Sequence, residues 1–371
     1  MKQCIFLFNP DNDLALAHGG GHYVAPPFAQ KMQADLCTLP MWYAPPGSAV
    51  LVPNDAVCEW VDEASRRCGL SVRGITPHEL PHATDAQFCP WGWSGTIKQR
   101  LTRLGVGAHL LPSDTALERI RQLAHRRSSI AMHRFIGSRT ALPLSPTPCE
   151  LTALADVLRF AKSHPGCYVK MPWSGSGQGV YHAIDPSTAA FEQWCRGALR
   201  RQGSLLCEVG LDRILDFALE YRCHGGNAEL VGYSVFESDF HSQYGGGIVA
   251  QREQLLHIIT GKYPDFPEII PIVSQAVSHI YAGSYDGFLG VDMLLYNHHG
   301  TTMLNPCVEV NLRATMGLVA GMAGERLTPA AGTGAFKIEC SKTGFSTSGK
   351  NRLLLTPVMP DTQYCAYIDW D

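Results

Sequence analysis

The sequence predicts a mixed fold, in which an α/β unit comes first and a larger α+β part follows. The chain has 371 residues, which is more than one average domain needs. Over residues 1–125 short apolar segments alternate with amphipathic helical segments, the pattern of a parallel sheet. Farther along, apolar segments flank polar turns, which is typical of antiparallel hairpins.

The first unit shows strand and helix signals in alternation. The apolar run CIFLF at 4–8 ends at a turn-prone segment, NPDND, and SAVLV at 48–52 ends at Pro53. Apolar residues recur at helical spacing over 56–68, and Gly69 ends that pattern. The predicted elements of this unit are strands at 4–8, 48–52 and 70–75 and helices at 56–68, 96–104 and 114–127.

The rest of the chain begins after a proline-rich connector at 142–148. It contains no internal repeat and no low-complexity tract. A closing hairpin is expected over 352–368, with its turn at Met359-Pro360-Asp361. The other predicted elements are helices at 152–163 and 267–282 and strands at 167–171, 288–296 and 303–311.

The composition excludes several classes of partner. The formal net charge is -3 and no block of Lys or Arg is present, which argues against nucleic acid. Thirteen cysteines occur without a C-x-x-C pair, which fits reduced thiols. The apolar run at 5–8 is too short for a signal-peptide core, and no segment approaches the roughly 20 apolar residues of a membrane span. We therefore expect a cytoplasmic protein with no membrane partner.

A glycine-rich segment follows the predicted strand at 167–171. Residues 168–180 read YVKMPWSGSGQGV, where alternate glycines let backbone N–H groups approach an anion and Lys170 adds a positive charge. The strand-like VYHAID after it indicates a flap over phosphates between two strands, not the helix-opening loop of a dinucleotide-binding unit. A plain glycine-rich hairpin turn is the alternative.

Two apolar strands carry polar side chains that suit a metal ion. Alternation places Glu309 and Asn311 on one strand face, and Asp292 on the partner strand can reach the same face. Two carboxylates and an amide oxygen are hard ligands suited to Mg²⁺. Arg313 keeps the same side and could hold a transferring phosphoryl group or an acyl phosphate. A solvated strand face is the alternative, although acids on apolar strands are costly unless they are paired.

A third segment, LLCEVGL at 205–211, leads from a strand into a loop. The backbone at Glu208 and Val209 could bind an adenine edge, and Asp216 could accept hydrogen bonds from ribose hydroxyls. By itself this segment is a generic strand and loop. On the strand that follows, Glu220 and Arg222 could face a cleft or pair with each other.

Taken in chain order, the three segments resemble the ATP-grasp superfamily of carboxylate–amine and carboxylate–thiol ligases, most closely over residues 165–320. The E-x-N element with an upstream Asp is the most specific part of the match. The resemblance implies an N-terminal Rossmann-like domain followed by two α+β subdomains that clasp ATP. It also implies phosphorylation of a carboxylate to an acyl phosphate, which an amine or another nucleophile then attacks.

The resemblance assigns a role to each matching residue and divides the chain into domains. Lys170 and Arg313 form the catalytic set. The implied domains are 1–125 (Rossmann-like), 126–205 (small subdomain with the glycine flap) and 206–371 (large subdomain with the Mg/ATP site). The implied ligands are Lys170 for the α/β-phosphates, Ser174, Gly175, Ser176, Gly177 and Gly179 for the β/γ-phosphates, Glu208 and Val209 for adenine, Asp216 for ribose, and Asp292, Glu309 and Asn311 for Mg²⁺ or Mn²⁺.

Two features depart from the family pattern. The family has an earlier Lys or Arg on the phosphates, but no lysine lies in that region here; Arg126, Arg127 and Arg134 are the candidates, and spacing favours Arg127. The N-terminal motif NPDND at 9–13, with HGGGH at 18–22, matches no ligase substrate pattern. A substrate contact and a structural loop both remain open for it.

The sequence thus predicts an ATP- and Mg²⁺-dependent ligase that activates a small carboxylate for attack by an amine or a similar nucleophile. The expected partners are small-molecule carboxylate and amine substrates, and a homodimer stays open. The alternative is a nucleotide-binding regulatory or scaffold protein without ligase activity, motivated by the unassigned first cation. A phosphotransferase with a non-carboxylate acceptor would share the same ATP site.

Overall fold

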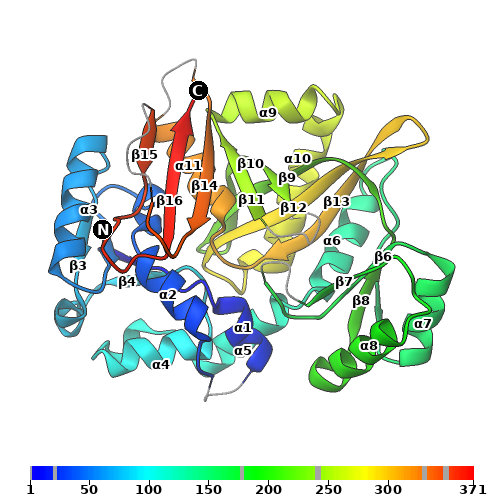
Figure 1. The fold of residues 1–371 in the computed structure, drawn as a ribbon, viewed down its shortest axis with the longest axis horizontal. Coiled ribbons are helices and arrows are strands. Elements are labelled where there is room, and N and C mark those ends of the chain that lie inside the picture. The colour runs from blue at the N-terminus through cyan, green and yellow to red at the C-terminus, as the bar shows by residue number, and fades with distance from the viewer. Residues whose placement is uncertain (1, 20–22, 176–178, 239–243, 328–331, 346–350) are drawn as a thin grey trace.

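The computed structural model describes residues 2–19, 23–175, 179–238, 244–327, 332–345 and 351–371. Within these residues the strands form three sheets with helices packed around them (Figure 1). The large sheet lies above the other two in that view. No helix of this part of the chain is both long and apolar enough to cross a bilayer.

The N-terminal sheet is parallel, with strand order β3-β2-β1-β4, which confirms the parallel sheet predicted for the first unit. Helix α3 begins where the Asn54 side chain accepts a hydrogen bond from the Val57 N–H at 3.1 Å, and it ends at Gly69 with φ 67°. The strands are β1 (Cys4–Leu7), β2 (Ala49–Leu51), β3 (Arg73–Ile75) and β4 (Gln87–Pro90), and the helices are α1 (Asn12–His18), α2 (Pro27–Asp35), α3 (Asp55–Cys68), α4 (Gly95–Arg103) and α5 (Asp114–Leu123).

Two segments of this unit differ from the prediction. The expected helix at 114–127 is broken, because α5 ends at Leu123 and α6 (Arg127–Gly137) starts a separate helix. At the break the Arg126 N–H donates to the Pro172 carbonyl at 3.0 Å, a contact that sequence spacing could not reveal. The turn-prone NPDND segment opens α1, whose first turn closes with the Ala15 N–H on the Asp11 carbonyl at 3.0 Å.

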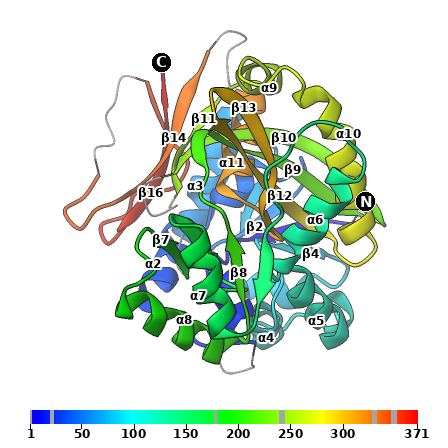
Figure 2. The ribbon, with the colours of Figure 1, turned by 90° about the vertical axis from the view of Figure 1, so that its right-hand side faces the viewer.

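The small sheet is antiparallel, with strand order β5-β8-β6-β7. Buried side chains from α7 and α8 pack with those of the strands in one apolar cluster, which includes Val157, Val169 and Phe191. Figure 2 shows α7 and α8 side by side over this sheet. The elements are β5 (Cys149–Leu151), β6 (Cys167–Lys170), β7 (Val180–Ala183), β8 (Leu205–Glu208), α7 (Leu154–Ser163) and α8 (Ala189–Gln202).

The large sheet is antiparallel, with strand order β13-β12-β9-β10-β11-β14-β16-β15. It contains both predicted hairpins, β12 with β13 and the closing β15 with β16. Helix α6 packs on this sheet through Met132 and Ile136. The strands are β9 (Asp212–His224), β10 (Asn227–Ser238), β11 (Tyr244–Val249), β12 (Gly287–His298), β13 (Thr301–Asn311), β14 (Gly334–Cys340), β15 (Arg352–Leu354) and β16 (Tyr364–Trp370), and the helices are α6, α9 (Arg252–Thr260), α10 (Phe266–Val277) and α11 (Met316–Leu327).

The N-terminal unit shares a core with the large sheet. One cluster of buried side chains combines Trp42 and Val50 of the first unit with Leu318 of α11 and Ile368 of β16. The Trp42 indole N–H also donates to the Leu355 carbonyl at 2.8 Å. Because apolar burial is continuous across these parts, the first unit is fixed against the sheet that carries β12 and β13.

Candidate functional site

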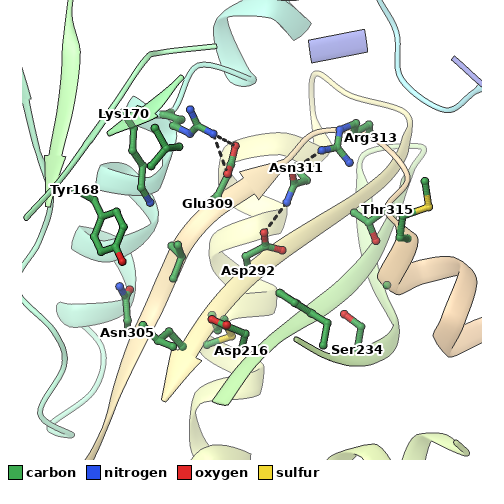
Figure 3. Close-up of a pocket in the computed structure, with 18 of the residues that line it drawn as sticks. Tyr168, Lys170, Asp216, Ser234, Asp292, Asn305, Glu309, Asn311, Arg313 and Thr315 are labelled. Carbon is green, nitrogen blue, oxygen red and sulfur yellow. Dashed lines mark hydrogen bonds and ion pairs between the residues drawn. The ribbon is translucent and has the colours of Figure 1, made fainter. Parts of the chain in front are cut away.

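A pocket of about 250 Å³ lies between the small sheet and the large sheet (Figure 3). The small sheet contributes residues from β6, β7 and β8, and the large sheet contributes residues from β9, β10, β12 and β13. The predicted site residues that line it are Lys170, Glu208, Val209, Asp216, Asp292, Glu309, Asn311 and Arg313. The fold therefore brings residues separated by up to 143 positions into one cavity.

Part of the pocket lining is apolar and suits a flat aromatic ring. Apolar and aromatic side chains from several strands converge there, and an extended apolar wall of this kind is common in sites for planar ligands. Except for Val209, sequence reasoning missed these residues, although Tyr168 lies two positions before Lys170 and therefore on the same face of β6. The members are Tyr168, Val180, Val209, Leu211, Phe236, Met293 and Leu294.

Lys170 and Glu208 form an ion pair across β6 and β8. Their side chains are only 7% and 11% exposed, so the pair is largely shielded from water. Tyr168 is the register partner of Glu208, which places this pair beside the apolar wall. The Glu208 side chain is thus committed to Lys170, and the backbone at Glu208 and Val209 remains at the pocket edge.

Asp292, Glu309 and Asn311 meet at the centre of the pocket. Asp292 and Glu309 are register partners on β12 and β13, and the Asn311 Nδ2 donates to Asp292 Oδ2 at 2.9 Å (Figure 3). Burial raises the pKa of Asp292 well above its usual range, and the nearby carboxylates of Glu309 and Glu220 raise it further. A cation placed between these acids would relieve both effects.

The donor set fits a hard divalent cation. It offers two carboxylates and one amide, whose oxygens are the ligand type that Mg²⁺ and Mn²⁺ prefer. Among the described residues no group of three or more His, Cys, Asp and Glu side chains is placed to hold a metal by itself. Asn311 and substrate oxygens would therefore have to complete the coordination.

Arg126 forms an ion pair with one acid of this set. Its side chain is 4% exposed, and its Nη2 lies 2.9 Å from Glu309 Oε1. Its Nη1 donates to the Met171 carbonyl at 2.7 Å and also to the Ser174 hydroxyl. One guanidinium therefore joins the start of the glycine-rich segment to the acidic strand.

Sequence spacing favours Arg127 as the first cation on the phosphates, but Arg127 is not at the pocket in the structure. Arg127 is exposed, begins α6 and does not line the pocket, and Arg134 is exposed on the same helix. The break between α5 and α6 turns Arg126 inward instead. The arginine that lines the pocket is therefore one residue before the one that spacing favours, a difference that the predicted continuous helix could not anticipate.

Ser174, Gly175 and Gly179, the predicted loop residues that the structure describes, do not line the main pocket. Ser174 lines a small adjoining cleft with Glu309 and Asn311. Gly179 has φ 73°, and a Cβ there would lie 2.8 Å from the Ser174 Cβ, so the turn requires glycine. A Cβ on Gly175 would lie 2.6 Å from an Asp13 carboxylate oxygen. The other predicted members of the loop, Ser176 and Gly177, lie outside the described residues.

The unassigned N-terminal motif reaches the site through Asp13. The Arg313 Nε donates to Asp13 Oδ2 at 2.8 Å, and its Nη2 donates to Asn311 Oδ1 at 3.0 Å. Asn9 exchanges two hydrogen bonds with the Gly92 backbone, which fixes the start of the motif. The motif thus has a structural role and also orients Arg313 at the pocket.

Two further carboxylates line the pocket. Asp216 accepts a hydrogen bond from Arg213 at 3.3 Å. Glu220 is 2% exposed and accepts hydrogen bonds from Ser234 and Thr315, and burial raises its pKa to about 7. From strand alternation, Glu220 could either face a cleft or pair with Arg222. The structure places it in the pocket lining.

Comparison with solved structures finds the same fold in three similar proteins. Biotin carboxylase from Campylobacter jejuni, solved as a β,γ-ATP complex, matches with a TM-score of 0.55 and 13% identity over 100% of this chain and 88% of that chain. The biotin carboxylase domain of Hydrogenobacter thermophilus 2-oxoglutarate carboxylase, solved with MgADP and bicarbonate, gives 0.52 and 14% over 87% and 86%. N5-carboxyaminoimidazole synthetase from Staphylococcus aureus gives 0.51 and 11% over 100% and 94%.

Sequence comparison adds no further relative, because no protein-family profile and no curated protein sequence matches the chain. The identities to these three structures are all below 15%, so the similarity is one of fold. The three proteins are ATP-grasp enzymes, and the resemblance expected from residues 165–320 is confirmed at this level: the chain has the ATP-grasp fold.

Proposed function

We propose that the protein is an ATP- and Mg²⁺-dependent ligase that activates a small carboxylate as an acyl phosphate for attack by an amine or a similar nucleophile. The observation that carries this proposal is the content of one pocket: an apolar wall, the Lys170–Glu208 pair and the Asp292, Glu309 and Asn311 set. The solved relatives bound to ATP, ADP or MgADP support it.

The proposal gives each part of the pocket a ligand. The apolar wall would hold adenine beside the backbone of Glu208 and Val209, and Asp216 would hold the ribose. Lys170 and Arg126 would contact the phosphates, and the loop that begins at Ser174 would cover them. When bound to Asp292, Glu309 and Asn311, Mg²⁺ or Mn²⁺ would supply charge neutralisation at the β- and γ-phosphates.

The protein's contribution to the chemistry is positioning and electrostatic stabilisation. A carboxylate oxygen of the substrate attacks the γ-phosphorus while the bond to the ADP oxygen breaks, and the nucleophile then displaces phosphate at the acyl carbon. Arg313 would hold the acyl phosphate, because its Nε is fixed by Asp13 and its charge faces the centre of the pocket. Buried cations placed in advance need little reorganisation when charge shifts.

The proposed division of the chain follows the three sheets. Residues 1–125 form the Rossmann-like unit, 126–205 the small subdomain and 206–371 the large subdomain. β8 runs three residues past the second boundary, and α6 packs on the large sheet, so these two elements would join the subdomains.

The test measures phosphate release from ATP over a panel of small carboxylates combined with amines. We expect release that needs Mg²⁺ and one carboxylate, and we expect Glu309→Gln to abolish it without unfolding the protein. ATP binding without substrate-stimulated release would favour the regulatory or scaffold alternative. A stable phosphorylated product that is not an acyl phosphate would identify a phosphotransferase.

A further inference from the structure

Glu220 lines the pocket but has no role in the proposed nucleotide and metal site. It is on β9, and it is flanked by Ser234 of β10 and Thr315 just before α11. Figure 3 shows Ser234 and Thr315 on the side of Asp292 that is opposite to Lys170. Because Glu220 is hydrogen-bonded to both, it lies on the side of Asp292 away from Lys170.

The hydrogen bonds of Glu220 fix its orientation but use only one oxygen. Ser234 Oγ and Thr315 Oγ1 lie 3.1 Å and 2.8 Å from Oε1. Thr315 Oγ1 accepts from the Leu318 N–H at 2.8 Å, so its hydroxyl hydrogen is committed to Glu220. No described residue donates a hydrogen bond to Oε2. The carboxylate therefore presents a held, free acceptor in the pocket.

Two glycines let the backbone pack closely against this carboxylate. A Cβ on Gly290 would lie 3.0 Å from Glu220 Oε2. A Cβ on Gly317 would lie 2.6 Å from Oε1 and 2.4 Å from Ser234 Oγ. Any larger residue at either position would crowd Glu220 and shift its carboxylate.

No described residue forms an ion pair with Glu220, although the charge of Arg313, which is itself paired with Asp13, lowers the pKa of Glu220. Each cationic residue in the described lining already has an acidic partner, and Asp292 is assigned to the metal. A buried carboxylate with no cationic partner is unfavourable, and a cation supplied by a ligand would offset that cost. The existing pairs are Arg126–Glu309, Lys170–Glu208, Arg213–Asp216 and Arg313–Asp13.

We propose that Glu220 selects the second substrate by binding a protonated amine through Oε2, so that this substrate is an ammonium-bearing compound. Before attack the ammonium gives one proton to Oε2. The free amine then attacks the acyl carbon, the bond to phosphate breaks, and the departing phosphate takes the second proton. The inference rests on the proposed ligase function and narrows its nucleophile to one chemical class. A charge-assisted N⁺–H···O⁻ hydrogen bond to a carboxylate held by two hydroxyls would be short and strong. An uncharged alcohol or thiol would leave the buried carboxylate unpaired, so the site would bind such a substrate less tightly than an ammonium compound.

The test compares wild type with Glu220→Gln, which keeps the side-chain shape and an acceptor for Ser234 and Thr315. Assays with ATP, Mg²⁺ and an active carboxylate use two kinds of nucleophile at pH 7.5: hydroxylamine, which is uncharged, and putrescine or glycine, whose amines are protonated. We expect the ratio of the KM for the amine to the KM for hydroxylamine to rise at least about tenfold in the variant. A ratio equal to that of wild type would overturn the inference.

The matched control is Glu229→Gln, which removes an exposed carboxylate from β10 outside the pocket. It should leave the KM ratio at the wild-type value. If Glu220→Gln does not fold, Gly290→Ala keeps the carboxylate and places a methyl group 3.0 Å from Oε2. That variant should raise the same ratio, and an unchanged ratio would again refute the proposal.

The two hypotheses can fail separately. If wild-type protein forms no hydroxamate with any carboxylate of the panel, the ligase function is refuted. Calorimetric binding of putrescine to the MgADP complex then still tests the role of Glu220, with a dissociation constant at least about tenfold higher expected for Glu220→Gln. Equal binding by both proteins would overturn the inference.

Discussion

Replacement of Arg126 by Met tests which arginine contacts the phosphates. Sequence spacing favours Arg127, whereas Arg126 lines the pocket in the structure. Arg126 is buried, its Nη2 lies 2.9 Å from Glu309 Oε1, and it donates to the Met171 carbonyl at 2.7 Å. In the proposed complex it would exchange the Glu309 contact for a nucleotide phosphate. A hydrogen bond to a charged group contributes about 1.5–3 kcal/mol, so Arg126→Met should raise the Kd for an ATP analogue about 10- to 150-fold.

The assay is calorimetric titration of a non-hydrolysable ATP analogue at saturating Mg²⁺, because the freed Glu309 carboxylate would otherwise change metal affinity. Arg127→Met is the matched control, since Arg127 is exposed and outside the pocket, and its Kd should equal that of wild type. Thermal unfolding of each variant checks that the fold persists. Normal binding by Arg126→Met together with weak binding by Arg127→Met would refute the assignment.

Three further substitutions probe the acids, the core and the N-terminal motif. Asp292→Asn should lower Mg²⁺-dependent turnover at least about 100-fold without lowering Tm, because the amide removes a buried acid that lies near two other carboxylates; a large drop in Tm would contradict this. Burial lowers the pKa of His133 to about 4, so between about pH 6.5 and pH 4 the unfolded state binds more protons than the folded state. Urea unfolding should therefore show that the free energy of unfolding falls by up to about 3 kcal/mol as the pH decreases over this range. His133→Gln should flatten this pH dependence. Gly92→Ala should cost about 1–3 kcal/mol, because its Cβ would lie 2.4 Å from the buried Asn12 amide, whereas Gly197→Ala in α8, with open space at its Cβ, should be neutral or stabilising; equal denaturation midpoints for the two variants would refute the clash.

The common strand face of Asp292, Glu309 and Asn311 was predictable because its signal is local. Glu309 and Asn311 alternate on an apolar strand, and Asp292 lies on the preceding apolar strand of the same hairpin. Strand period and a short turn are enough to place three such side chains on one face. The same local signals predicted the parallel N-terminal sheet and the closing hairpin.

The other parts of the site depend on contacts between distant segments. Arg126 turns inward because its backbone bonds to Pro172, 46 residues away. Asp13 reaches Arg313 across 300 positions, and Glu220 finds Thr315 across 95. No sequence period relates such distant pairs. Spacing therefore could not show that Arg126 is the residue of 125–127 that enters the pocket, or that the N-terminal motif contacts Arg313.

The central claim is that Asp292, Glu309 and Asn311 hold the metal that carries ATP. The most direct test is calorimetric titration of a non-hydrolysable ATP analogue into wild type and Glu309→Gln, with and without Mg²⁺, with Glu229→Gln as the control. We predict that Mg²⁺ tightens analogue binding by wild type and by the control but has no effect on Glu309→Gln. Equal Mg²⁺ dependence in all three proteins would contradict the claim.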